Sequence, residues 1–178
     1  SQKVRNFPYN ARVESVAFLP QEGGGLLPEG KVMLTGCNDR VCRMQDQNGK
    51  LLEQPFTQAN KAVFSEDGTL VLTGNSDGTL KIWDLTTKRS IPIQHAERSV
   101  TALAFSPLAG SKAFAIGSSS GVVVYWDSIG AQAVSFKLSM PMPILSLAFA
   151  PDGKSIVLGE QGGLTEIRDI SGKMIKEY

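Results

Sequence analysis

The chain has 178 residues, of which 42% are hydrophobic and 20% are charged, so it is long enough to bury a sizeable core. Its formal net charge is +1, from 18 Lys and Arg against 17 Asp and Glu, which excludes a long-range basic field for nucleic acid and an acidic field for basic partners. Two cysteines and no run of eighteen apolar residues favour a cytoplasmic, intracellular protein with no disulfide framework and no membrane partner.

The N-terminal segment KVRNFPYN, at residues 3–10, aligns with KLLEQPFT at residues 50–57. Each segment is followed within nine residues by an apolar run that is typical of a β-strand. Residues 3–9 are therefore predicted to be the last strand of an earlier unit.

The first complete unit begins with a predicted strand at residues 13–19. A long tip, PQEGGGLLPEGK, separates it from the strand that leads into Gly36, and its part from Gly25 to Lys31 has the spacing of a phosphate-binding loop. Such a loop needs Ser or Thr after the lysine and a helix beyond it, whereas Val32 begins a strand. A solvated loop is therefore the better interpretation.

The second unit contains the most specific local signal, LTGNSDGTLKIWDL at residues 72–85. Asp77 and Gly78 favour a tight turn with positive φ, and the residues on either side suit extended strands. Gly74 ends the first of these strands and Asp84 ends the second, ten residues later. The segment is predicted to be a β-hairpin.

The same interval recurs through the chain, at Gly36–Asp46, Gly74–Asp84, Gly117–Asp127 and Gly159–Asp169. Upstream of the glycines, strands that contain a phenylalanine are predicted at residues 13–19, 59–65, 100–106 and 144–150. Downstream of the aspartates, short polar joints lead to LLEQPF, SIPIQ, AVSFKL and MIKEY. A repeat of about 44 residues predicts one supersecondary unit stacked several times, because a single four-stranded unit cannot bury its own faces.

Two units end in a pattern that resembles the closing dipeptide of the WD-repeat family, Ile82-Trp83-Asp84 and Tyr125-Trp126-Asp127. The other two depart from it, with Gln45-Asp46 and Arg168-Asp169. Members of this family form β-propellers, so the resemblance implies an all-β fold of four consecutive four-stranded antiparallel blades, plus an orphan N-terminal strand. The blade units span about residues 13–56, 57–94, 95–138 and 139–178 of the sequence.

The first strand of each unit is the most continuously apolar, and we expect these strands to be buried on both faces near the middle of the propeller. WD-repeat propellers most often have seven blades, for which this chain supplies too few units. Residues 3–9 and 171–178 are both predicted last strands, although a blade accepts only one. We expect a segment of a larger propeller, a ring completed by another copy through exposed terminal blades, or a free-standing four-blade ring.

His95 is the only histidine, in a connection where WD repeats often carry a histidine that bonds to an aspartate in a turn of the same blade. Here Ser120 stands in the place of that aspartate, and no second histidine or carboxylate pair is placed to work with His95, so a structural role is predicted. Four more residues are predicted to be structural, Asp39 and Asp77 in turns and Trp83 and Trp126 between neighbouring blades.

Cys37 and Cys42 invite a metal interpretation, yet a zinc site needs a second such pair or added histidines. We predict two thiols in one hairpin, with Cys42 buried and Cys37 near the turn, and no metal or cofactor.

The connections between units and the second-to-third-strand turns emerge on one rim of a propeller, the face that WD-repeat domains commonly present to partners. Tyr, Arg and Met are enriched at the centres of interfaces. The rim positions predicted to bind a partner are Tyr9, Arg12, Arg40, Asn60, Arg98, Met140 and Met142, with Asn10, Gln58 and Glu97 beside them.

The resemblance implies a non-catalytic scaffold for protein–protein interaction that presents this rim to a protein or peptide, within a larger regulatory or scaffold protein. The alternative is a propeller-based enzyme or small-ligand sensor that uses the central channel, which would need converging acid–base or metal groups. Nucleic-acid recognition is disfavoured by the near-zero net charge and by aromatic residues that fall in strands instead of loops.

Overall fold

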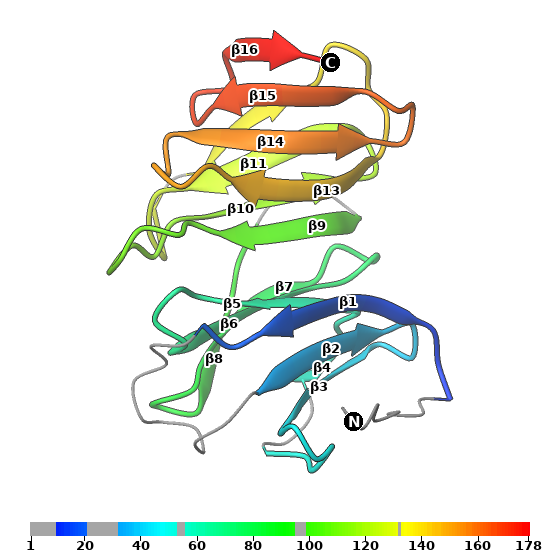
Figure 1. The fold of residues 1–178 in the computed structure, drawn as a ribbon, viewed down its shortest axis with the longest axis vertical. Coiled ribbons are helices and arrows are strands. Elements are labelled where there is room, and N and C mark those ends of the chain that lie inside the picture. Colours follow the sequence, from blue (N-terminus) through cyan, green and yellow to red (C-terminus); the bar gives the residue numbers. More distant parts are fainter. Residues whose placement is uncertain (1–9, 21–31, 53–55, 95–98, 132) are drawn as a thin grey trace, which may run out of the picture.

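The structure is a computed structural model, and it describes residues 10–20, 32–52, 56–94, 99–131 and 133–178. The described residues form four four-stranded antiparallel sheets in a β-propeller arrangement, with no helix among them (Figure 1). The prediction of an all-β chain with four consecutive blades is therefore confirmed. In that part of the chain no helix is long and apolar enough to cross a membrane.

The strands of each blade follow one another in the sequence, and each pairs with the next. Blade 1 consists of β1 (Val13–Phe18), β2 (Met33–Cys37), β3 (Val41–Gln45) and β4 (Phe56–Thr57). Blade 2 consists of β5 (Lys61–Phe64), β6 (Leu70–Gly74), β7 (Leu80–Asp84) and β8 (Arg89–Pro92). Blade 3 consists of β9 (Val100–Phe105), β10 (Phe114–Ser118), β11 (Val122–Trp126) and β12 (Val134–Lys137). Blade 4 consists of β13 (Ile144–Phe149), β14 (Ser155–Glu160), β15 (Thr165–Asp169) and β16 (Met174–Glu177).

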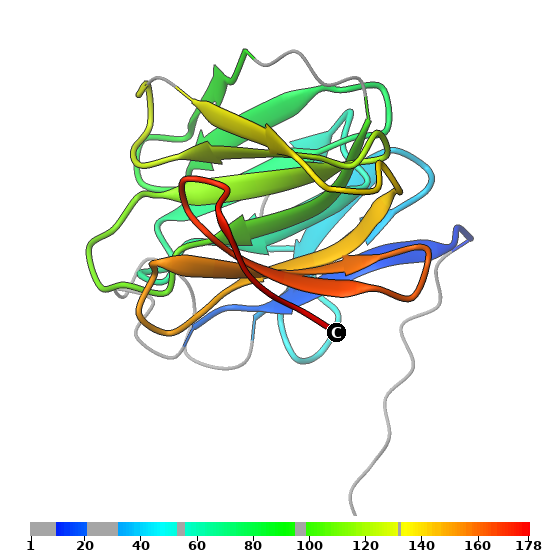
Figure 2. The same cartoon turned by 90° about the horizontal axis from the view of Figure 1, so that it is seen from above.

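The first strands lie side by side in chain order, with β1 beside β5, β5 beside β9 and β9 beside β13. Figure 2 shows the same sheets from above, with blade 4 in orange and red nearest the viewer. Of the predicted last strand of the first unit, LLEQPF, Leu51 forms an isolated bridge to Gln45 and Phe56 begins β4, whereas residues 53–55 lie outside the described residues. The predicted orphan strand at residues 3–9 and the tip from Gly25 to Lys31 lie outside the described residues.

The core lies between the blades, in three apolar clusters that correspond to the three junctions of neighbouring blades. Successive residues of a strand point to opposite faces, so each inner strand contributes to two junctions. Along β6, Val71 packs between blades 1 and 2, whereas Leu70 and Leu72 pack between blades 2 and 3. Every residue of β6, β10 and β11 is buried for this reason.

In blades 1 to 3 the glycine that marks the repeat is required by the close approach of the next blade, whereas a Cβ on Gly159 would meet Ser146 of its own blade at 2.5 Å. A Cβ atom added to Gly74 would come within 2.7 Å of Val100 in the next blade, and one added to Gly117 within 2.6 Å of Ile144. Real Cβ atoms do not approach other heavy atoms so closely, so any larger residue would push neighbouring blades apart.

The expectation that the first strands are the most buried is wrong. Val16 and Phe18 on β1 are 73% and 65% exposed, whereas Phe64, which occupies the position of Phe18 in blade 2, is only 7% exposed. Phe64 is covered by blade 1, but the described residues contain no blade that covers the outer face of β1. Burial of a first strand thus depends on the neighbouring blade and not on its own composition.

The two tryptophans lie at blade junctions. Trp83 packs edge-on against Phe56, which lies on the last strand of blade 1, with ring centroids 5.2 Å apart. Its Nε1 donates to Thr73 Oγ1 at 2.9 Å. Trp126 is 3% exposed and stacks on Phe114 at 4.7 Å, between blades 2 and 3. Each indole therefore fills space between two sheets.

Blade 4 has Arg168 in place of the tryptophan. Its guanidinium lies 5.8 Å from the ring centre of Phe136 on β12, the last strand of blade 3, so it meets the preceding blade much as Trp83 does. Arg168 is buried, and its Nε donates to Glu166 Oε2 at 2.5 Å, while its other nitrogens donate to the Gly172 carbonyl and to Ser139. The ion pair compensates the charge that replaces an apolar ring.

Replacing Arg168 with alanine should lower the free energy of unfolding by about 3–5 kcal/mol, because Glu166 would remain buried without its counter-ion. Urea denaturation of the intact protein measures this loss. The control is Arg12→Ala, which removes a side chain that is 77% exposed and should change stability by at most about 1 kcal/mol. Equal effects of the two substitutions would contradict the proposed role of the buried pair.

Glu160, at the end of β14, is 5% exposed, and neither of its carboxylate oxygens has a hydrogen-bond partner. Burial, reinforced by the nearby carboxylates of Glu166 and Glu177, raises the pKa of Glu160 above its ordinary value, and Arg168 only partly offsets this. The folded state therefore holds the Glu160 proton to a higher pH than the unfolded chain does.

Because this pKa is raised on folding, the stability associated with Glu160 is greatest at low pH and falls as the pH rises above about 4.3, the ordinary value for glutamate. Urea denaturation between pH 4 and pH 8 should show that Glu160→Gln loses less stability over this interval than the wild type. Identical pH profiles would show that Glu160 is not buried as a carboxylic acid.

Candidate functional site

One rim of the propeller is held together by hydrogen bonds between the connections that enter the blades and the turns that link second and third strands. The N–H of Asn38 donates to the Arg12 carbonyl at 2.9 Å, that of Ala59 to the Arg40 carbonyl at 3.1 Å, and that of Gln161 to the Pro143 carbonyl at 2.9 Å. These bonds fix the backbone of the rim, so its side chains have defined positions.

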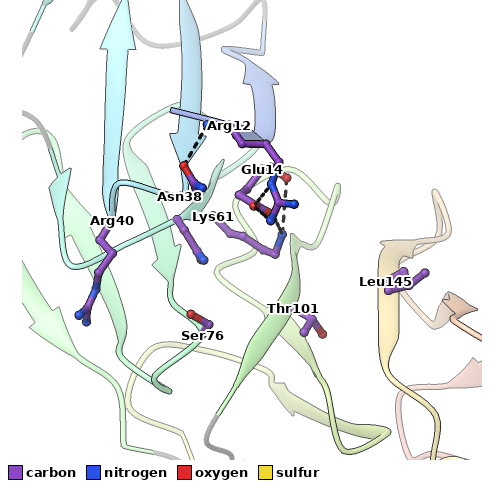
Figure 3. Close-up of a pocket in the computed structure, with 9 residues that line it drawn as sticks. Arg12, Glu14, Asn38, Arg40, Lys61, Ser76, Thr101 and Leu145 are labelled. Atoms are coloured by element: carbon purple, nitrogen blue, oxygen red, sulfur yellow. Dashed lines mark hydrogen bonds and ion pairs between the residues drawn. The ribbon is translucent and has the colours of Figure 1, made fainter. Parts of the chain in front are cut away.

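A pocket of about 490 Å³ opens on this rim and receives side chains from all four blades (Figure 3). Four of its residues occupy the same repeat position, four residues before the phenylalanine of each first strand. They are Glu14, Asn60, Thr101 and Leu145. The other lining residues are Arg12, Asn38, Arg40, Lys61 and Ser76.

The charges that line the pocket are three cations and one carboxylate. Glu14 lies between two of the cations, with Arg12 at 2.5 Å and Lys61 at 3.9 Å (Figure 3). Arg40 forms an ion pair with Asp77, in the corresponding turn of blade 2. The side chains of Arg40 and Asp77 are 56% and 43% exposed, so solvent screens their attraction.

Arg40 has an unusual backbone conformation, with φ at 65°. Its N–H closes the turn of blade 1 on the Cys37 carbonyl at 3.1 Å, and the residues that close the same turn in the other blades are Gly78, Gly121 and Gly163, all with positive φ. Glycine adopts this conformation without strain, whereas an L-residue such as arginine does not. Blade 1 therefore holds an arginine where the fold favours glycine.

Asn60 lines the pocket and carries an unsatisfied acceptor. Its N–H donates to the Gly74 carbonyl at 3.0 Å, and its own carbonyl is so close to Gly36 that a Cβ there would lie 2.3 Å away. The backbone of Asn60 is thus held between blades 1 and 2. Its side-chain Oδ1 is buried and has no hydrogen-bond partner.

Three of the residues predicted to bind a partner, Arg12, Arg40 and Asn60, line this one pocket. Met140 and Met142 do not line it; Met140 is 57% exposed, and the side chain of Met142 lies beside Gly162 in the turn of blade 4. Tyr9, Arg98 and Glu97 lie outside the described residues, as does His95.

The aspartates predicted to shape turns accept hydrogen bonds from the backbone two residues on. Asp39 Oδ1 accepts from Val41 at 3.1 Å, and Asp77 Oδ1 accepts from Thr79 at 2.9 Å. Asp39 also pairs with Arg43 at 2.6 Å. In blade 3 the corresponding turn contains Ser120, whose hydroxyl lies 2.8 Å from that of Ser118.

Sequence reasoning missed Glu14, Lys61, Thr101 and Leu145, because it placed the rim in the connections and turns and not in the first strands. The signal that could have found three of them is the fixed offset from the repeated phenylalanine, which assigns Glu14, Thr101 and Leu145 to one position of the repeat together with Asn60. Residues at one repeat position converge around the axis of a propeller.

Among the described residues, no group of three or more His, Cys, Asp or Glu side chains could hold a metal ion. Cys37 and Cys42 are buried free thiols. Burial raises the pKa of Cys42 to about 12, so its thiol stays protonated at neutral pH and is a poor nucleophile or metal ligand.

The profile of the family described as WD domain, G-beta repeat, matches residues 57–84. The chain is 24% identical over 146 residues to the U3 small nucleolar RNA-associated protein 15 homolog of Xenopus laevis, covering 80% of this chain and 28% of that protein. It is 27% identical over 161 residues to eukaryotic translation initiation factor 3 subunit I of Nematostella vectensis, covering 79% of this chain and 49% of that protein. It is 26% identical over 147 residues to the small ribosomal subunit protein RACK1y of Oryza sativa subsp. japonica, covering 78% of this chain and 40% of that protein. The chain thus spans less than half of the length of each of these relatives.

Replacing Arg40 with glycine should raise the free energy of unfolding by about 0.5–1 kcal/mol, because relief of the positive-φ strain outweighs the loss of an exposed ion pair. Arg40→Ala is the matched control, since it removes the same side chain but keeps an L-residue in the turn, and it should not stabilise the protein. Urea denaturation of both variants measures the difference. If glycine and alanine destabilise equally, the backbone of Arg40 is not strained.

Proposed function

Because the chain is a WD-repeat β-propeller protein, we propose that it is a non-catalytic scaffold that presents the rim pocket to a protein or peptide partner. The proposal rests on the convergence of one residue from each blade, Glu14, Asn60, Thr101 and Leu145, together with the cations of the rim, on a single open pocket. A set that combines an acid, an amide, a hydroxyl and an apolar group suits the mixed contacts of a polypeptide.

The pocket offers little for catalysis or for a nucleic-acid backbone. Its one carboxylate, Glu14, is engaged by Arg12 and Lys61, and no lining residue is a nucleophile paired with a base. With a net charge of +1, the chain lacks the field expected of a phosphate binder. A protein or peptide is therefore the proposed partner, in preference to a nucleic acid, a membrane or a substrate.

The names of the relatives support a role within larger assemblies, since they include a subunit of a translation initiation factor, a protein of the small ribosomal subunit and an RNA-associated protein. We place the protein in the cytoplasm, because Cys37 and Cys42 are free thiols of the kind found in reducing compartments. The outer face of β1, with Val16 and Phe18 exposed, is proposed to receive a further blade, from a longer protein or from a second copy.

Affinity capture with the intact protein tests the role of the rim. The rim variant carries Arg12→Glu, Arg40→Glu and Lys61→Glu, which reverse the charges of the three pocket cations. The control carries Lys154→Glu and Lys173→Glu, which reverse two exposed charges in turns of blade 4 at the end of the strands away from the rim. From an extract of the source organism, treated with nuclease, partners should be captured equally by the wild type and the control, and about tenfold less by the rim variant.

Capture of the same proteins by the rim variant would contradict the use of this surface. Loss of all captured proteins on nuclease treatment, together with a steep decrease of binding with salt, would instead indicate nucleic-acid recognition.

A further inference from the structure

We infer that the rim pocket recognises an acidic side chain carried by an extended peptide, and that Arg40 is the residue that selects it. The inference rests on the proposed function, and it specifies the chemistry of the partner. Three independent features of the pocket support it: the position of Arg40, the charge of the pocket and the unsatisfied amide of Asn60.

Arg40 occupies a turn position that is glycine in the other three blades. Because an arginine is strained there, the backbone gives no reason for its presence, and its side chain must supply one. Arg40 lines the pocket, and its guanidinium pairs with Asp77, with both side chains substantially exposed. A carboxylate from a partner can take the place of Asp77 at little energetic cost, since exposed ion pairs contribute little.

The pocket as a whole favours an anion. Arg12, Arg40 and Lys61 line it, whereas Glu14 is its one lining carboxylate and Asp77 lies beside Arg40. The side chain of Lys61 is only 19% exposed, and its Nζ donates to the Glu14 carbonyl at 3.5 Å, so its ammonium group is held beside the backbone of β1. A planar guanidinium can bind both oxygens of an aspartate or glutamate side chain, and the other two cations that line the pocket add to the attraction.

Asn60 distinguishes a peptide from a free anion. Its buried Oδ1 lacks a hydrogen-bond partner, so a turn of the side chain toward the pocket on binding would let it accept from a donor, which a carboxylate ion does not possess. A backbone N–H is such a donor, and an extended peptide presents one beside each side chain. On blade 4, Leu145 is 59% exposed and offers an apolar contact to a neighbouring residue of the peptide. A volume of about 490 Å³ admits a few residues and not a folded domain.

Selection of a phage-displayed random peptide library on the intact protein tests the inference without assuming a partner. Peptides that bind the wild type but not the rim variant should share one aspartate or glutamate. For a synthetic peptide of this group, fluorescence anisotropy should show at least a tenfold loss of affinity when its acidic residue is changed to the amide. With Arg40→Gly the same change in the peptide should alter affinity less than twofold, while Lys154→Gln should behave as the wild type.

The role of Asn60 has its own readout. Replacing single backbone amides of the peptide with N-methyl amides should identify one position at which affinity for the wild type falls about tenfold. The same peptide should lose little affinity for Asn60→Ala, because that variant lacks the acceptor. A uniform effect of N-methylation in both proteins would overturn the assignment of Asn60.

The results separate the two proposals. Rim-dependent peptides without a shared acidic residue, or an acidic residue whose effect is unchanged in Arg40→Gly, would overturn the inference but leave the rim as an interaction surface. Peptides that bind the rim variant as well as the wild type, or a library from which no binder is enriched, would overturn both. Thermal denaturation checks the fold in parallel, because Arg40→Gly should melt no lower than the wild type.

Discussion

Each blade of this protein is a pleated sheet with two apolar faces, and both faces must be covered. Side chains alternate across a strand, so Val71 and Leu72 on β6 enter different junctions although they are adjacent in the chain. No blade can satisfy this condition alone, which explains why the sequence repeats and why its core lies between sheets instead of within them. Gly36, Gly74 and Gly117, at or near the ends of the second strands of blades 1 to 3, then set how closely the blades approach.

Because the core lies between the blades, the blade junctions tolerate little change in side-chain shape or charge, whereas the side chains of the rim can vary. Turns and connections on the rim are fixed by backbone hydrogen bonds, so a side chain there can change without loss of a core contact. Arg40 illustrates the freedom, since it replaces a glycine of the other blades at the cost of some strain. Arg168 illustrates the limit, because a charge at a blade junction requires Glu166 and further hydrogen bonds to offset its burial.

The fold could be predicted from the sequence because its signals are local and repeated. The interval from Gly74 to Asp84 determines a hairpin, and its recurrence determines the number of blades. The exposure of Phe18 could not be predicted, because it depends on whether another blade is adjacent and not on the residue itself. Arg40 and Asn60 could be placed on the rim from their position in the repeat. Their convergence with Thr101 and Leu145 requires the curvature of the propeller, which no single unit encodes.

The face of blade 1 that no described blade covers and the rim pocket are physically connected through β1. Glu14 forms part of the pocket, and Val16 and Phe18 expose apolar surface a few residues along the same strand. Strands at an uncovered face have fewer contacts and therefore open more readily than strands between two blades. A further blade packed on Val16 and Phe18 would hold β1, and with it the bonds of Glu14 to Arg12 and Lys61, in one position. Covering that face would thereby reduce the entropy that is lost when a ligand orders the pocket, so addition of a blade would be coupled to affinity at the rim.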